Sequence, residues 1–201
     1  DAWATAIDAP PRERGSIFAA KHGRLIVDGA DRGPFVPMPT QVAMLDAFSE
    51  PRITYIYCYK SARTGYTQVL AQAIHYHVHH RPRSQLILQP TVEDAKGFCL
   101  ETIDPMVDAC PTMGERIAPA KSRTSGNTQR RKTYPGGIFH LNGATSAGGF
   151  RRIDVGIIYF DEVDGYPITA GDEGDQIGLG IKRAEWHADK KFAIGSTPTL
   201  D

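Results

Sequence analysis

The sequence predicts an α/β fold in which helices flank a central, mainly parallel sheet. Strand-like and helix-like patterns alternate along much of the chain, as they do in successive βαβ units. Residues 157–160 form an unbroken apolar run, which is typical of a parallel strand buried on both faces. Residues 53–59 are rich in β-branched and aromatic side chains, and a glycine-containing loop and a helical periodicity at 69–78 follow them. These observations together indicate parallel strands connected by helices.

The first part of the chain contains a leading segment, a helix and the first strand. Residues 1–23 combine a Pro-Pro pair with scattered charges. We interpret them as an N-terminal arm or a short leading helix, with one domain following at residues 24–201. Apolar residues recur at helical spacing over 41–48 and predict a helix there. The strand at 53–59 is expected to be buried, because its residue types are those of sheet interiors.

The remaining elements continue the alternation of strands and helices. Thr91 is a favourable N-cap for a helix whose first turn carries two acids. Gly-Asn and Pro-Gly-Gly sequences mark turns in a region that we interpret as a hairpin pair with a polar tip. We expect a strand at residues 85–88, a helix from 92 to about 106 and this hairpin region at 124–144. Another helix is expected at 176–187, and a final strand at 192–194.

Residues 60–67, Lys-Ser-Ala-Arg-Thr-Gly-Tyr-Thr, have the pattern of a phosphate-binding loop with a displaced lysine. The usual loop is G-x-x-x-x-G-K-[ST], in which backbone N–H groups and the lysine bind phosphates. Gly65 and Thr67 hold the expected sixth and eighth positions, but Tyr66 occupies the lysine position and Lys60 stands first. A loop that leads into a helix N-terminus is an anion site. Taken alone, the segment could also be an ordinary strand–turn–helix connection.

A second motif lies at the end of the buried strand, where Asp161 and Glu162 follow the apolar run. In enzymes with a phosphate-binding loop, an acid at this place holds Mg²⁺ beside the loop Ser or Thr. Asp161 and Thr67 fit that role, and Glu162 could polarise the attacking water as a general base. A solvated acidic strand end is the structural alternative. The two motifs together favour binding of ATP and Mg²⁺ and hydrolysis of ATP.

The motifs resemble those of the lambda-type phage terminase large subunit, in its N-terminal ATPase domain. The phosphate loop of that family likewise carries its lysine at the start. The resemblance covers roughly residues 24–199 and includes further segments at 39–41, 88–95, 146–151, 161–164 and 195–199. It implies a P-loop NTPase fold of the helicase-like (ASCE) type. The implied function is an ATPase motor that translocates double-stranded DNA into a procapsid.

The resemblance also assigns roles to individual residues. The expected catalytic residues are Glu162, Lys60 and Arg63, and the expected metal ligands are Thr67 and Asp161. ATP binding is expected at Gln41, on the adenine side, and along the loop at Lys60, Ser61, Ala62, Arg63, Thr64, Gly65, Tyr66 and Thr67. A coupling motif near the end of the chain is represented by Ser196, Thr197 and Thr199.

The partners that the resemblance implies are double-stranded DNA, the portal protein of the procapsid and the small terminase subunit. A homo-oligomeric ring is expected during packaging in the cytoplasm of the infected host, and a mostly monomeric protein when the domain is isolated. The nuclease domain of the family follows the coupling motif, so we expect this chain to lack it. Two alternatives stay open: a helicase-like nucleic-acid-dependent ATPase, and a nucleotide-binding scaffold without turnover.

Composition narrows the class of protein without identifying it. Lys and Arg number 23, as do Asp and Glu, so the net charge is zero and nothing global indicates nucleic-acid binding. Three cysteines are widely spaced and predict reduced thiols, not a disulfide framework. No apolar run approaches the ~18 residues of a membrane span, and the first residues lack the apolar core of a signal peptide.

Several basic groups are weaker candidates. The cluster His75, His77, His79 and His80 could contribute to a metal site, but a solvated helix face is the favoured interpretation. The run at 130–132 could contact a phosphate backbone or form a solvated hairpin tip. Arg63 could stabilise the γ-phosphate in cis. Candidates for an arginine finger offered to a neighbouring subunit are Arg151, Arg152 and Arg183.

Overall fold

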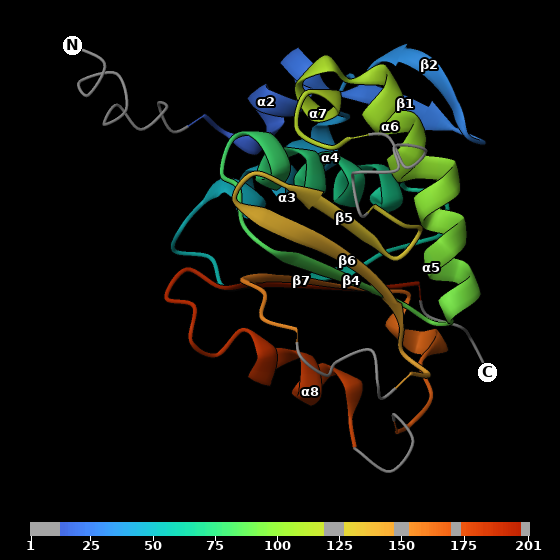
Figure 1. Ribbon diagram of the computed structural model, residues 1–201, viewed down its shortest axis with the longest axis vertical. Coiled ribbons are helices and arrows are strands. Elements are labelled where there is room, and N and C mark those ends of the chain that lie inside the picture. Colours follow the sequence, from blue (N-terminus) through green and yellow to red (C-terminus); the bar gives the residue numbers. More distant parts are fainter. Residues whose placement is uncertain (1–12, 119–126, 147–152, 170–173, 198–201) are drawn as a thin grey trace.

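The computed structural model describes residues 13–118, 127–146, 153–169 and 174–197, and its centre is a six-stranded sheet (Figure 1). Every neighbouring pair of strands is parallel except β5 and β6. In spatial order the strands are β3 (Tyr55–Tyr59), β8 (Lys191–Ser196), β7 (Ile157–Asp161), β4 (Gln85–Gln89), β6 (Gly137–Gly143) and β5 (Arg131–Tyr134). The predicted α/β fold with a mainly parallel sheet is confirmed.

Helices cover both faces of the sheet (Figure 1). One face carries α3 (Pro39–Ser49), α4 (Tyr66–His79), α5 (Val92–Phe98), α6 (Asp104–Ala109) and α7 (Pro111–Gly114), and the other carries α8 (Gln176–Arg183). Side chains alternate along each strand, so Ile87 packs into the larger core and Leu88 into the core beneath α8. In the part of the chain that is described, no helix has the length and apolar character needed to cross a membrane.

A helix and a small hairpin precede α3. Helix α2 (Gly15–His22) packs against α3 and α4 and buries Phe18, so this part of the leading segment is a short helix. Strands β1 (Arg24–Val27) and β2 (Ala30–Pro34) form a separate antiparallel pair that was not predicted from the sequence. Their turn is Asp28-Gly29, with φ of 51° and 73°. Asp-Gly with two positive φ angles is a strong hairpin signal.

Strand β3 corrects the prediction of a buried strand at 53–59. It lies at the edge of the described sheet and pairs with β8. Tyr55, Tyr57 and Tyr59 are 45%, 72% and 85% exposed, whereas Ile56 is buried. Aromatic and β-branched residues favour a strand at an edge as much as at the centre, because one face of an edge strand still packs on the core. The alternation of exposure identifies β3 as a half-covered strand.

The helix predicted from 92 to about 106 is divided into three segments. Thr91 caps α5 as expected, since its hydroxyl oxygen accepts a hydrogen bond from the backbone N–H of Asp94 at 3.1 Å. A π-helical segment (Cys99–Ile103) then separates α5 from α6. Pro105 lies in the first turn of α6 and has no N–H to donate to the preceding turn. The proline explains why the helix is interrupted at this point.

The basic run at 130–132 is a solvated tip only in part: Arg130 and Arg131 are exposed at a tight turn closed by Thr128 and Arg131, whereas Lys132 is buried. The turn between β5 and β6 lies at residues 135–136, and the run lies at the opposite end of β5. Lys132 is only 1% exposed, and its Nζ forms an ion pair with Asp104 Oδ1 at 2.6 Å. Strand alternation turns Lys132 inward while Arg131 stays exposed. Lys132 therefore ties β5 to α6 and is not available to contact a phosphate backbone.

The histidines of α4 also differ from the prediction of a solvated face. His75 and His77 are fully buried, because α2, α3 and α7 all pack around α4. His75 Nε2 lies 2.8 Å from the hydroxyl of Thr112. Burial lowers the pKa of both imidazoles, which are therefore neutral near pH 7. Within the described ranges no group of three or more His, Cys, Asp or Glu side chains is arranged to hold a metal ion.

Candidate active site

The carboxyl ends of β3, β7 and β8 meet the N-terminus of α4 around a small cavity. The cavity measures about 280 Å³ and is lined by Lys60, Ala62, Arg63, Thr64, Gly65, Tyr66, Thr67, Glu162 and Thr197. Ligands of open α/β sheets bind outside the carboxyl ends of the strands. A larger cavity of about 620 Å³ lies beside α3 and the start of α2. It contains none of the loop residues, so the smaller cavity is the candidate site.

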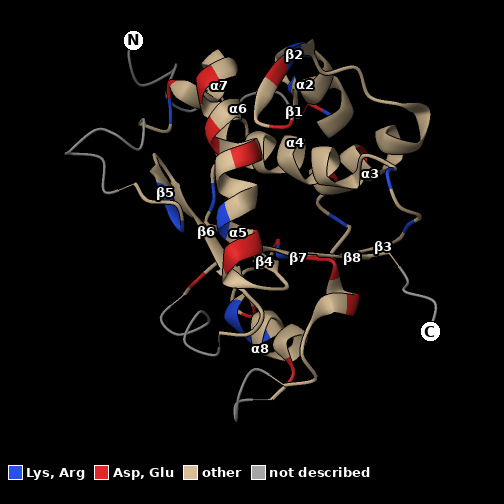
Figure 2. Ribbon diagram, turned by 90° about the vertical axis from the view of Figure 1, so that its right-hand side faces the viewer, with Lys and Arg blue, Asp and Glu red and all other residues tan. Residues whose placement is uncertain are grey.

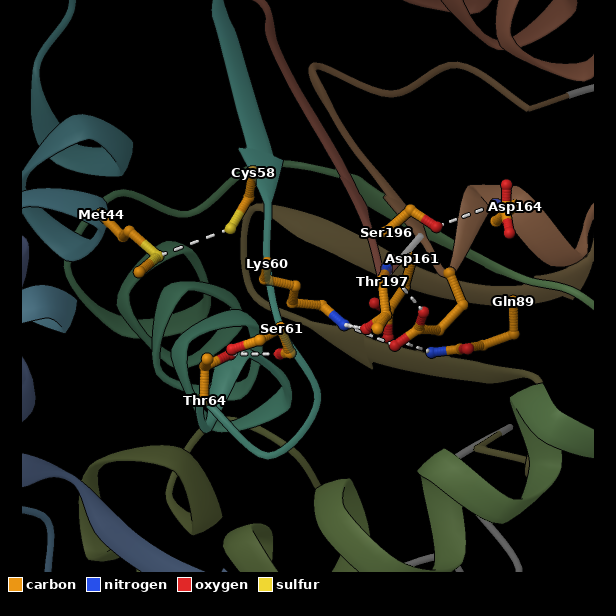
Figure 3. Close-up of polar contacts among 11 residues, drawn as sticks. Met44, Cys58, Lys60, Ser61, Thr64, Gln89, Asp161, Asp164, Ser196 and Thr197 are labelled. Carbon is orange, nitrogen blue, oxygen red and sulfur yellow. Dashed lines mark hydrogen bonds and ion pairs between the residues drawn. The ribbon is translucent and has the colours of Figure 1, made fainter. Parts of the chain in front are cut away.

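Lys60 is at the centre of the polar contacts in this cavity (Figure 3). Its Nζ lies 2.5 Å from Glu162 Oε1 and donates a hydrogen bond to Thr197 Oγ1 at 2.8 Å. The backbone N–H of Thr197 donates in turn to Glu162 Oε2 at 3.3 Å. The Lys60 side chain is 9% exposed and that of Glu162 is 43% exposed. The two predicted catalytic groups are therefore paired with each other and with the predicted coupling residue.

Backbone conformation brings Glu162 to the lysine. Strand β7 ends at Asp161, and Glu162 then adopts the left-handed region with φ 51° and ψ 52°. A short 3-10 helix (Val163–Gly165) follows directly. Arg63, within the loop, also has a positive φ of 63°. Such conformations are costly for residues with a side chain and cluster at functional sites.

Asp161 has one oxygen engaged and one without a partner. Gln89 Nε2, at the end of the neighbouring strand β4, donates to Asp161 Oδ2 at 3.0 Å (Figure 3). Asp161 Oδ1 is buried, and no hydrogen-bond partner for it is present in the described residues. Burial raises the pKa of this carboxyl, and the hydrogen bond from Gln89 opposes that effect. A buried carboxylate oxygen without a partner suits a cation, so the residues present fit Mg²⁺.

Gln41 supports the loop from beneath. It is 3% exposed, its Oε1 accepts a hydrogen bond from the N–H of Met38, and its Nε2 donates weakly to the carbonyls of Thr64 and Gly65 at 3.4 Å. Gly65 has φ 74°, and a Cβ there would lie 2.6 Å from Gln41 Nε2. The close approach and the positive φ explain the glycine. Gln41 thus contacts loop backbone, and neither it nor Ser61 lines the cavity in the described structure.

The other predicted residues divide between the site and its surroundings. The backbone N–H of Lys60 donates to the carbonyl of Ser196 at 3.2 Å, and Ser196 Oγ accepts from the N–H of Asp164 at 3.0 Å. Arg183 ends α8 on the opposite face of the sheet and does not line the cavity. Thr199, Arg151 and Arg152 lie outside the described residues.

Gln89 is a further residue of the candidate site that was not predicted from the sequence. Its segment was noted for resemblance, but no role followed from it, because Gln89 and Asp161 are 72 residues apart. Its position was the available signal. A polar residue directly after the apolar run 86–88 lies at the same sheet edge as Asp161 if the two strands are parallel neighbours, as they are here.

The sheet order, the loop at the head of α4 and the acids at the end of β7 define a P-loop NTPase fold. Comparison with known families is more specific. Residues 29–201 match the family described as phage terminase large subunit gpA, ATPase domain, and the chain belongs to this family. The resemblance stated from the sequence is confirmed.

Individual relatives agree with the family. The large terminase subunits of Enterobacteria phage P21 and Escherichia phage lambda are each 31% identical, over 170 and 171 residues. Each alignment covers 84% of this chain, and the chain spans 26% of each relative. The bacteriophage HK97 large terminase has a similar fold, with a TM-score of 0.67 at 17% identity, covering 92% of this chain and 37% of that one. The ATPase domain of the Thermus phage P74-26 large terminase gives 0.50 at 18% identity, covering 83% and 67%.

Proposed function

We propose that this chain hydrolyses ATP as the motor domain of a phage terminase large subunit. The observation that carries the proposal is the contact of Lys60 with Glu162 and Thr197 in the cavity beside the predicted phosphate-binding loop. The predicted cation, the predicted general base and Thr197 of the predicted coupling motif meet at one point, as a site that couples hydrolysis to movement would require. Membership of the terminase ATPase family supports the same activity.

The side chains have separate tasks in this proposal. The nucleotide phosphates bind the N–H groups of the loop and of the first turn of α4. Lys60 leaves Glu162 to bind phosphate oxygens, and Glu162 is then free to polarise the attacking water. Arg63 lines the cavity and is placed to stabilise the γ-phosphate. Asp161 and Thr67 would hold Mg²⁺, which supplies positive charge to the phosphate oxygens when it is bound.

The wider biology is proposed on the strength of the family. The translocated substrate is double-stranded DNA, moved into a procapsid through its portal, with the small terminase subunit as a further partner. Subunits assemble into a ring when they package DNA, in the cytoplasm of the infected host. The ATPase domain is proposed to comprise residues 24–201, with helix α2 packed against it.

Phosphate release tests the proposal directly. Glu162→Gln keeps the shape of the side chain but removes the base, so turnover should fall roughly 10²-fold or more while ATP affinity changes little. Glu115→Gln is the matched control, because Glu115 is exposed and does not line the cavity. A wild-type rate in Glu162→Gln would remove Glu162 from the catalytic role.

The same assay with added nucleic acid separates the alternatives. Stimulation by double-stranded DNA supports a packaging motor, whereas stimulation by single strands alone supports a helicase-like ATPase. Nucleotide binding without phosphate release under any condition supports a non-hydrolysing scaffold.

A further inference from the structure

Tyr66 stands where a phosphate-binding loop normally carries its lysine, and its surroundings give the ring a specific place. It is the first residue of α4 and is 3% exposed. Its hydroxyl is buried, and no hydrogen-bond partner is found for it in the described part of the chain. A buried hydroxyl without a partner is unfavourable. Among the described residues, the contact that Tyr66 makes with a charged group of the site is made by its ring.

The ring of Tyr66 packs between Lys60 and strand β8. Lys60 Nζ lies 5.4 Å from the ring centroid, within the range of a cation–π contact. Behind the ring is Gly195 of β8, where a Cβ would lie 2.5 Å from Cζ and from the hydroxyl oxygen of Tyr66. No larger residue fits at Gly195 without moving the ring. The ring is thus held by strand β8 and faces the ammonium group.

We propose that Tyr66 is a positioning residue for Lys60, which rests on the proposed role of Lys60 in binding phosphate. Lys60 has three partners: the Glu162 carboxylate, the Thr197 hydroxyl and the ring of Tyr66. Phosphate oxygens compete with Glu162 for the ammonium, but the ring carries no charge and does not compete. The ring therefore keeps the Lys60 ammonium beside the cavity both when it is paired with Glu162 and when it is bound to phosphate. Lys60, at the first position of the loop, can then bind the phosphates because Tyr66, at the seventh position, holds its ammonium in place.

Arg63, the other cation of the loop, has no comparable restraint among the residues that the structure describes. It is exposed, although it lines the cavity as Lys60 does. Lys60 instead has a side chain that is nine-tenths covered and held on several sides. Tyr66 thus positions Lys60 and not Arg63. Replacing Tyr66 should therefore have little effect on ATP affinity when Lys60 is absent.

A double-mutant cycle tests this inference with ATP affinity, measured by calorimetry, as the readout. Tyr66→Leu should weaken ATP binding at least fivefold when Lys60 is present and less than twofold in the Lys60→Ala background. Tyr66→Phe keeps the ring and should restore affinity to within threefold of wild type. Phe139→Leu, a buried aromatic replacement on β6, controls for general loss of stability.

Each outcome has a separate meaning. Equal weakening by Tyr66→Leu in both backgrounds, or no weakening in either, would overturn the inference and leave Tyr66 as a packing residue. Unchanged affinity in Lys60→Ala, with loss in Arg63→Ala, would instead overturn the proposed role of Lys60. If Tyr66→Leu fails to fold, Gly195→Ala is a second test of the inference, because it retains Tyr66 but displaces its ring. Gly195→Ala should also lower ATP affinity at least fivefold, and wild-type affinity there would contradict the inference.

Discussion

At the scale of single residues, the site is built from side chains that the chain brings together from distant positions. Lys60 and Glu162 are 102 residues apart, and Lys60 and Thr197 are 137 apart. Each could be named from the sequence, because each follows a strand pattern and belongs to a recognisable motif. Their mutual contact could not be predicted, since it depends on the left-handed backbone of Glu162 and on the order β3-β8-β7.

Gln89 gives a prediction at this scale. Gln89→Leu removes the hydrogen bond to Asp161 and leaves a buried carboxylate with fewer partners. The free energy of unfolding should fall by ~1–3 kcal/mol, and Mg²⁺ should enhance nucleotide binding less than in wild type. Urea denaturation and nucleotide titration with and without Mg²⁺ measure the two effects. Unchanged Mg²⁺ dependence in Gln89→Leu would show that Gln89 does not orient the carboxylate for a metal.

At the scale of elements, the sequence predicts strands and helices well but not their limits or their neighbours. The interruption between α5 and α6 follows from Pro105, whose effect could have been anticipated. The edge position of β3 could not be predicted, because residue types indicate that one face of a strand is buried but not how many strands lie beside it. The inward turn of Lys132 depends on the register of β5 against β6, which the tight turn at residues 135–136 sets.

Strand β8 also anchors helix α3, which leads to a prediction. Lys191 is 2% exposed, and its Nζ donates to the carbonyls of Glu50 and Ile53 at 2.6 and 2.7 Å. These carbonyls lie just beyond the C-terminal end of α3, where a cation is favourable. Lys191→Met should lower the free energy of unfolding by ~1–3 kcal/mol, because it leaves carbonyls unpaired. Lys190→Met is the control, and an equal effect in both variants would contradict the anchoring role.

At the scale of the whole molecule, the buried histidines predict how stability depends on pH. Burial lowers the pKa of His75 to about 3 and that of His77 well below 6.5. The unfolded chain therefore binds more protons than the folded protein below pH 6.5, so stability is lost as pH falls. Well below pH 6.5 each histidine should cost about 1.4 kcal/mol per pH unit, and between pH 7.5 and 6.5 the cost should be much smaller. Urea denaturation at pH 7.5, 6.5 and 5.5 measures the slope, which His75→Gln should reduce.

Charge distribution predicts how the isolated chain behaves towards DNA and towards other copies. Lys and Arg equal Asp and Glu in number, and Figure 2 shows both kinds interspersed along the described ribbon. Without net positive charge, few phosphates are neutralised on contact, so DNA binding should be weak, and added salt should weaken it further. We also expect a mostly monomeric protein with slow ATP hydrolysis, because in the proposed ring neighbouring subunits would complete one another's sites. Sedimentation and DNA titrations at low and high salt measure both properties, and a stable ring or DNA binding that persists at high salt would contradict the expectation.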